Sequence, residues 1–373
     1  MKKNKSKYNN QNAISKKEHS TRFLISVFAA LTFALLSAMY WIVAKNAASL
    51  NPANFVLTKT LEEQTEFTDQ VAFSPNGKWL ASCNSDGKVR IWDASEFKLR
   101  LTLDLGKTES EAICFSPDSQ QLACGGSSVT LWNPSTGELL RRFKRLPVED
   151  NYQTCVNTIQ YSPDGKTIAT GVGNSIYLWD VATGNQQNKW KAHLSNIYTL
   201  DYSPDGTILA SAGSDYHEID DRDTIFSGDS TSFIYFWNPK DGKKLNKLVG
   251  HKDEILSLSF SPNGDMLASA SYDESVKIWN AKTGKILRNI KKSRGSESVV
   301  EFAPDSSYIA AGGMDIEPNS IETLVRIYSV TNGNLIQSIK GNKVENRTIS
   351  FSPDGKKFAC GGFDSGIKIY GAP

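Results

Sequence analysis

The chain repeats one short unit seven times, and no other feature restricts its fold as strongly. Each unit opens with an aromatic residue followed by Ser-Pro-Asp-Gly or a close variant; these residues are Phe73, Phe115, Tyr161, Tyr202, Phe260, Phe302 and Phe351. A second aromatic residue closes each unit: Trp92, Trp132, Trp179, Trp237, Trp279, Tyr328 and Tyr370. Successive opening aromatics lie 41 to 58 residues apart, a period typical of propellers and solenoids.

The unit around Phe260 divides into four stretches of strand length, 255–260, 266–270, 275–279 and 286–290, separated by turn residues. Short apolar and small-residue runs bounded by Gly, Pro, Asn and Asp favour strands over helices. A four-stranded sheet cannot bury both faces alone, so the units must pack on one another. The repeat therefore predicts an all-β fold, a seven-bladed β-propeller of four-stranded antiparallel blades.

These units resemble the WD repeat. The likeness rests on Gly250-His251, Ser269, Asp273 and Trp279-Asn280, together with the dipeptides Trp92-Asp93 and Trp179-Asp180. In that family a His, a Ser or Thr, an Asp and a Trp form a buried hydrogen-bond chain within a blade, because a buried imidazole and a buried indole N–H both require partners. The resemblance implies two complete sets here: His251, Ser269, Asp273, Trp279 and His193, Ser211, Asp215, Trp237.

The last unit contains only three strands before the sequence reaches Pro373. An incomplete sheet would leave an exposed edge, which is a hazard for wrong pairing. Residues 55–61, FVLTKTL, precede the first unit in the position of a missing fourth strand. We therefore predict that the propeller comprises residues 54–373 and is closed by pairing of 55–61 with the C-terminal blade.

The segment before the propeller has the pattern of a membrane anchor. Residues 1–22 are basic and too polar to fold, which predicts a disordered tail. Residues 23–43 contain no charge and would span about 32 Å as a helix, enough for a single transmembrane pass, and 44–53 form a linker. A cleaved signal peptide and a buried core helix are the alternatives; the long basic region and the length of the apolar run favour the anchor.

The charge distribution around this segment predicts its orientation. Seven Lys or Arg residues precede it, whereas only Lys45 follows closely. Positive residues stay in the cytoplasm, so the N-terminus is expected there and the propeller on the far side of the bilayer. That side is periplasmic or extracellular in a bacterium, and lumenal or extracellular in a eukaryote.

Three insertions interrupt the regular spacing, at 145–153, 216–232 and 316–322. They fall either between the second and third strands of a unit or between consecutive units, and such connections share one end of the blades, here called the top face. Long loops on a rigid scaffold are frequent binding elements, although neutral drift of surface loops is the alternative. The bilayer, through residues 23–43, and a protein bound at the top face are the expected partners.

The insertion at 216–232 contains a group of acidic residues. Asp220, Asp221, Asp223 and Asp229 could hold a hard cation through carboxylate oxygens, but the EF-hand spacing is absent and a solvated acidic loop is the default interpretation. No catalytic or nucleotide-binding motif is found, so neither an enzyme nor a cofactor is expected. The net charge of +2 gives no overall basic field for nucleic acid.

The sequence thus favours a membrane-anchored scaffold for protein–protein interaction. The alternative, from a different class, is an enzyme or small-molecule-binding protein that uses the central channel of the propeller. Converging charged groups with a perturbed acid in the channel would favour this alternative. An apolar patch over the top face would favour the scaffold.

Overall fold

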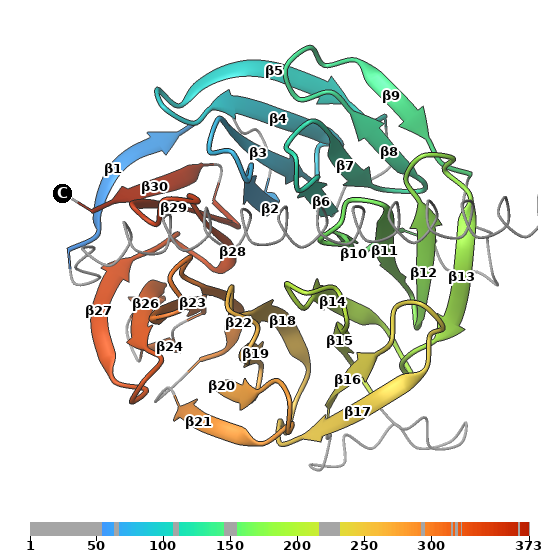
Figure 1. Cartoon of the computed structure of the whole chain (residues 1–373). Helices are drawn as coiled ribbons and strands as arrows, with labels where there is room; N and C mark the ends of the chain where they lie inside the picture. Colours follow the sequence, from blue (N-terminus) through green and yellow to red (C-terminus); the bar gives the residue numbers. More distant parts are fainter. Residues whose placement is uncertain are drawn as a thin grey trace, which may run out of the picture. The chain divides into compact units, whose positions relative to one another are not determined.

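The computed structural model describes residues 54–62, 67–106, 112–144, 155–215, 232–291, 295–314, 316–317, 320–321, 323–364 and 366–372. Within these residues the chain forms seven antiparallel four-stranded sheets and one two-stranded ribbon, with no helix. The sheets are arranged radially as blades around a central channel (Figure 1). The predicted all-β, seven-bladed fold is therefore confirmed.

Each blade runs outward from a first strand at the channel. Blades 1 to 4 comprise β2 (Thr68–Phe73), β3 (Trp79–Asn84), β4 (Lys88–Asp93), β5 (Lys98–Asp104); β6 (Ala112–Phe115), β7 (Leu122–Gly125), β8 (Val129–Trp132), β9 (Leu139–Arg142); β10 (Thr158–Tyr161), β11 (Thr167–Val172), β12 (Ser175–Asp180), β13 (Gln186–Lys191); and β14 (Ile197–Tyr202), β15 (Leu209–Gly213), β16 (Phe233–Trp237), β17 (Lys244–Val249).

The remaining blades follow the same plan. Blades 5 to 7 comprise β18 (Ile255–Phe260), β19 (Met266–Ser271), β20 (Ser275–Asn280), β21 (Ile286–Lys291); β22 (Glu297–Phe302), β23 (Tyr308–Gly313), β26 (Leu324–Ser329), β27 (Leu335–Lys340); and β28 (Asn346–Phe351), β29 (Lys357–Gly362), β30 (Ile367–Gly371), β1 (Val56–Leu61). The ribbon pairs β24 (Ile316–Glu317) with β25 (Ser320–Ile321).

Burial explains the composition of the strands. The second strands are covered on both faces by neighbouring blades, so β19 reads MLASAS with every residue after the first fully buried. The outermost strands are largely exposed, as in β9, which reads LLRR. Each hydrophobic cluster joins adjacent blades; one combines Ala210 and Phe236 of blade 4 with Phe260 and Trp279 of blade 5. Packing between blades therefore supplies the core.

The repeated turn has the same physical basis in successive blades. In blade 1, Gly77 donates its N–H to the carbonyl oxygen of Ser74 at 2.8 Å and has a φ of +69°, a conformation that favours glycine. The Ser74 hydroxyl donates to Asn76 at 2.8 Å and accepts the N–H of Trp79 at 2.9 Å. These bonds fix the hairpin between the first and second strands.

The ring is closed by the earliest described segment of the chain. Strand β1 pairs antiparallel with β30, with Val56 opposite Gly371 and Leu61 opposite Ile367 (Figure 1). Phe55, just before β1, is buried and lies 5.1 Å, ring to ring, from Phe358. Two hydrogen bonds join its backbone to the side chain of Gln337 in blade 6.

No helix among the described residues has the length and apolar character needed to cross a bilayer. The transmembrane segment 23–43, the basic tail 1–22 and the linker 44–53 lie outside the described residues. Their assignment stays a prediction.

Candidate interaction site at the mouth of the central channel

The first complete set of WD-type residues forms one continuous hydrogen-bond chain in blade 4. Trp237 Nε1 donates to Ser211 Oγ at 2.8 Å, and Ser211 Oγ lies 2.8 Å from His193 Nε2. His193 Nδ1 lies 3.0 Å from Asp215 Oδ2. Burial alone would raise the pKa of Asp215, but His193 and the backbone N–H of Leu194 hold it below its ordinary value.

Blade 5 contains the same chain. Trp279 Nε1 donates to Ser269 Oγ at 2.8 Å, and His251 lies between Ser269 and Asp273 with distances of 2.6 Å and 2.9 Å. Burial lowers the pKa of His251, and Asp273 only partly offsets this effect. Because Ser211 and Ser269 are fully buried and already bonded, both sets have structural roles, and neither presents a nucleophile to solvent.

Sequence reasoning missed a basic residue two positions before the closing aromatic in several blades. Arg90 forms an ion pair with Asp86 at 2.7 Å in blade 1, and Lys277 contacts Asp273 at 3.4 Å in blade 5. Lys368 lies 3.9 Å from Asp364 in blade 7. These residues share one position in the repeat, so a basic residue at that position is a signal that the sequence contains.

The predicted insertions are only partly visible. Residues 145–153 and Asp220, Asp221, Asp223 and Asp229 lie outside the described residues, so the cation hypothesis stays a prediction. The insertion at 316–322 contains the ribbon of β24 and β25. Within the described part of the chain, no three His, Cys, Asp or Glu side chains are grouped so that they could hold a metal ion.

The first strands of the seven blades enclose a channel of about 850 Å³. In five of these strands the pairing register shifts by one residue, and the extra residue of each bulge lines the channel: Asp69, Tyr198, Leu256, Ser298 and Arg347. A bulge redirects a side chain that a regular strand would place elsewhere. The side chains that these bulges supply stand at the top end of the strands.

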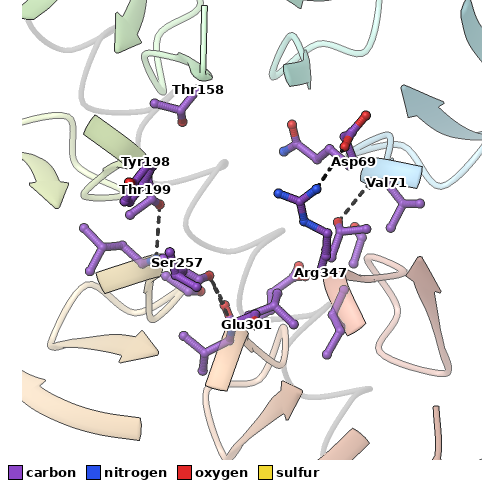
Figure 2. A pocket seen from close by; sticks show the side chains of 18 of the residues that line it. Asp69, Val71, Thr158, Tyr198, Thr199, Ser257, Glu301 and Arg347 are labelled. Atoms are coloured by element: carbon purple, nitrogen blue, oxygen red, sulfur yellow. Dashed lines mark hydrogen bonds and ion pairs between the residues drawn. The ribbon is translucent and has the colours of Figure 1, made fainter. Parts of the chain in front are cut away.

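Arg347 lies at this top end of the channel, here called the mouth, where blade 7 meets blade 1. Its guanidinium lies 3.3 Å from the carboxylate of Asp69 (Figure 2). It also lies 5.0 Å from the ring centre of Phe363. Phe363 in turn packs edge to face against Phe67, with ring centres 4.8 Å apart. Arg347 and Phe67 both remain 44% exposed, so an approaching molecule can reach them.

Two tyrosines and two glutamates continue the mouth across blades 4 to 7. Burial, the carboxylate of Glu254 and the nearby Tyr272 raise the pKa of Tyr198 to about 12. Burial and the charges of Glu345 and Glu254 also raise the pKa of Tyr272, whose side chain is 43% exposed. The hydroxyl of Ser298 donates to Glu345. We call the following residues the mouth cluster: Phe67, Asp69, Tyr198, Glu254, Tyr272, Ser298, Glu345, Arg347 and Phe363.

Deeper in the channel lie two carboxyl groups with unusual titration. Burial raises the pKa of Asp201 to about 7 and that of Glu301 to about 8. Buried acids with a raised pKa are typical of ligand-binding and catalytic sites. However, Asp201 accepts the N–H of Phe260 at 2.6 Å and Glu301 accepts that of Phe351 at 3.3 Å, which are bonds between neighbouring blades. Both acids therefore have a structural explanation.

Seven four-stranded blades, with a Trp–Ser–His–Asp chain inside two of them, define a β-propeller of the WD type. The sequence profile described as "WD domain, G-beta repeat" matches residues 55–93, 144–180, 184–217, 242–280 and 333–371, together half of the chain. The chain therefore belongs to this family.

Three of the proteins to which the chain is similar come from plants. The chain is 26% identical over 259 residues to the transcriptional corepressor LEUNIG_HOMOLOG of Arabidopsis thaliana, covering 61% of this chain and 32% of that protein. It is 23% identical over 238 residues to guanine nucleotide-binding protein subunit beta of Zea mays, with coverage of 62% and 60%. It is 28% identical over 266 residues to the WD repeat-containing protein WDS homolog of Arabidopsis thaliana, with coverage of 60% and 48%. The chain spans less than two thirds of each relative.

Proposed function

We propose that this protein is a membrane-anchored interaction platform, and that the mouth cluster is where its protein partner binds. The observation that carries the proposal is the exposure of Phe67, Tyr272 and Arg347 around one end of the channel. Tyr and Arg are enriched among the residues that dominate binding energy at protein interfaces. A rigid ring holds these side chains in place, which reduces the entropy lost on binding.

We place the insertions on the same face from the connectivity of the blades. Tyr272 lies in the turn between the second and third strands of blade 5, and Glu254 lies in the connection from blade 4 to blade 5. The insertions 216–232 and 316–322 join second to third strands, and 145–153 joins two consecutive blades. A partner seated on the mouth cluster would therefore also meet these loops.

The relatives support this class of function. One is named a corepressor and another a subunit of a guanine nucleotide-binding protein, and these names describe regulation and assembly. By analogy, the present chain acts by holding a partner and requires no chemistry of its own. The likeness extends to this class of function and not to one partner, because fold alone does not determine function.

The membrane part of the proposal rests on sequence. Residues 23–43 span the bilayer once, 1–22 remain in the cytoplasm, and the propeller lies on the far side. Protease added outside intact cells or spheroplasts should digest or release the propeller while leaving an epitope tag at residue 1 protected. Protection of the propeller and digestion of the tag would reverse the assigned orientation.

Partner binding can be tested by cross-linking and capture from membranes with the full-length chain. Tyr272→Ala and Arg347→Ala should each reduce partner recovery at least tenfold, as expected for residues at the centre of an interface. The matched control is Leu335→Ala, which removes a 52%-exposed side chain from the outermost strand of blade 6. Equal recovery from all three variants would exclude the mouth cluster as the binding site.

A second candidate function is a ligand-binding or catalytic channel, which the two buried carboxyl groups with raised pKa, Asp201 and Glu301, would suit in addition to their structural bonds. Asp201→Asn and Glu301→Gln separate the two functions. Loss of partner recovery in these channel variants, with Tyr272→Ala unaffected, would favour a channel ligand over the platform.

A further inference from the structure

Side chains on the first strands tie each blade to the next around the channel. The first ring of bonds uses the residue three positions before the opening aromatic, which accepts a backbone N–H of the following blade. Its acceptors and donors are Gln70 with Ile113, Thr158 with Leu200, Thr199 with Leu258, Ser257 with Val300, and Thr348 with Val71, at 2.9 to 3.2 Å. Figure 2 shows several of these residues on adjacent strands.

A second ring uses the residue immediately before the opening aromatic. Its acceptors and donors are Asp201 with Phe260, Ser259 with Phe302, Glu301 with Phe351, and Ser350 with Phe73, at 2.6 to 3.3 Å. The targets are the backbone N–H groups of the opening aromatics themselves. First strands at the channel have no strand partner on that side, so these bonds satisfy backbone donors that would otherwise be buried without one.

The junction between blades 6 and 7 differs from its neighbours. Blades 4 and 5, and likewise blades 5 and 6, are joined through both rings. In blade 6 the first-ring position is Val299, whose side chain cannot accept a hydrogen bond. The bond from Phe351 N–H to Glu301 is thus the only one of this pattern that blade 6 can offer to blade 7, and its acceptor is titratable.

Few other charges face Glu301. Among the strands packed against β22, titratable side chains are Arg347 on β28, Tyr308 on β23 and Lys277 on β20. These three are engaged with Asp69, the Phe55 ring and Asp273, respectively. The charge that acts on Glu301 is that of Asp201, two blades away around the channel; Asp201 also acts on Cys114. No cation in this set compensates Glu301.

We propose that the junction between blades 6 and 7 is a proton-controlled latch, closed when Glu301 is protonated and loosened when Glu301 and Asp201 are both ionised. A protonated carboxyl keeps an oxygen that can accept the N–H of Phe351 and carries no charge into the channel. An ionised Glu301 carboxylate in the closed ring accepts only the N–H of Phe351 in this pattern and faces the like charge of Asp201. Its free energy therefore falls when it leaves this N–H and becomes hydrated.

The direction of the pH dependence follows from the pKa values. The pKa of Glu301 is raised from 4.5 to about 8 in the closed ring, mainly by burial. Opening the junction exposes Glu301 to water, so its pKa returns toward 4.5. The stabilisation of the closed state is therefore complete below about pH 4.5, declines as pH rises, and is lost by about pH 8.

Hydrogen exchange of the full-length chain in detergent micelles tests the latch. After correction for intrinsic exchange, protection of the Phe351 amide should fall at least about tenfold between pH 5 and pH 8 and level off above pH 8. The Phe302 amide, bound by the hydroxyl of Ser259, is the internal control and should stay constant. Glu301→Gln should remove the pH dependence at Phe351. In Asp201→Asn the fall in protection of Phe351 should be complete at a lower pH, because the substitution removes the repulsion that adds to the effect of burial on the pKa of Glu301.

Three results would overturn the latch. Protection of Phe351 could be independent of pH, it could fall in parallel with that of Phe302, or it could fall equally in wild type and Glu301→Gln. The second result would indicate loosening of the whole ring, and the third a different titrating group.

Discussion

Removing the side chain of Phe55 should show how much the closing strand contributes to stability. Phe55 is 1% exposed and packs against Tyr308, Phe351 and Phe358 at ring-centre distances of 6.4, 6.3 and 5.1 Å. Truncation of a buried Phe to Ala costs about 3–5 kcal/mol through lost burial and the cavity left behind. For a domain of this size, about 2–4 °C per kcal/mol then gives a fall in Tm of about 6–20 °C.

Phe67→Ala provides a matched control for Phe55→Ala. Phe67 is 44% exposed and has one ring contact, with Phe363. Its removal should cost about 1 kcal/mol or less. Thermal unfolding of the full-length variants at one scan rate, followed by tryptophan fluorescence, measures both. If Phe55→Ala lowers Tm no more than Phe67→Ala, the packing of the closing segment does not stabilise the ring as argued.

Variants at two further positions test the interior. Ser269→Ala should lower the free energy of unfolding by about 2–4 kcal/mol, because it leaves His251 Nε2 and Trp279 Nε1 buried without their shared partner. Ser269→Thr should be tolerated, since Thr170 accepts the N–H of Trp179 at the same position of blade 3; equal losses in a chemical denaturation series would contradict this account. Asp201→Asn should raise stability at pH 8 by about 1–3 kcal/mol and change it little near pH 4, because the pKa of Asp201 is raised by burial to about 7 and the cost of ionisation appears only as pH rises toward that value. Denaturation midpoints that shift equally at both pH values would show that ionisation is not the cause.

Most of the fold could be predicted from the repeat. The strands expected at 255–260, 266–270, 275–279 and 286–290 correspond to β18 to β21, whose bounds differ by at most one residue. This agreement has a physical reason, because Pro and Gly in the turns and the alternation of small and large residues fix the strand positions locally. Residues 55–61 also lie beside the last blade, where an unpaired edge required a strand.

The candidate site at the channel mouth was harder to predict from the sequence. The bulge residues Asp69, Tyr198, Leu256, Ser298 and Arg347 share a position but not a chemistry, so no repeated letter marks them. The two rings of hydrogen bonds were hard to predict for the same reason. Thr, Ser, Gln, Asp and Glu all accept an N–H, so no single residue type marks these positions, and the donors lie in another blade. The insertions at 145–153 and 216–232 and the segment 23–43 lie outside the described residues, so the expectations for them stand as predictions.

The pairing of β1 with β30 sets an order of events during synthesis. Thr58 donates its hydroxyl to the carbonyl oxygen of Ile369, 311 residues further along the chain. A ribosome that adds 5–20 residues per second needs about 15–60 s to cover that distance. During this time the first strand is made but its partner does not yet exist, and a free strand can pair wrongly. Lys59 in the middle of VLTKTL discourages such pairing, so the first strand is partly protected against wrong pairing until β30 has been synthesised.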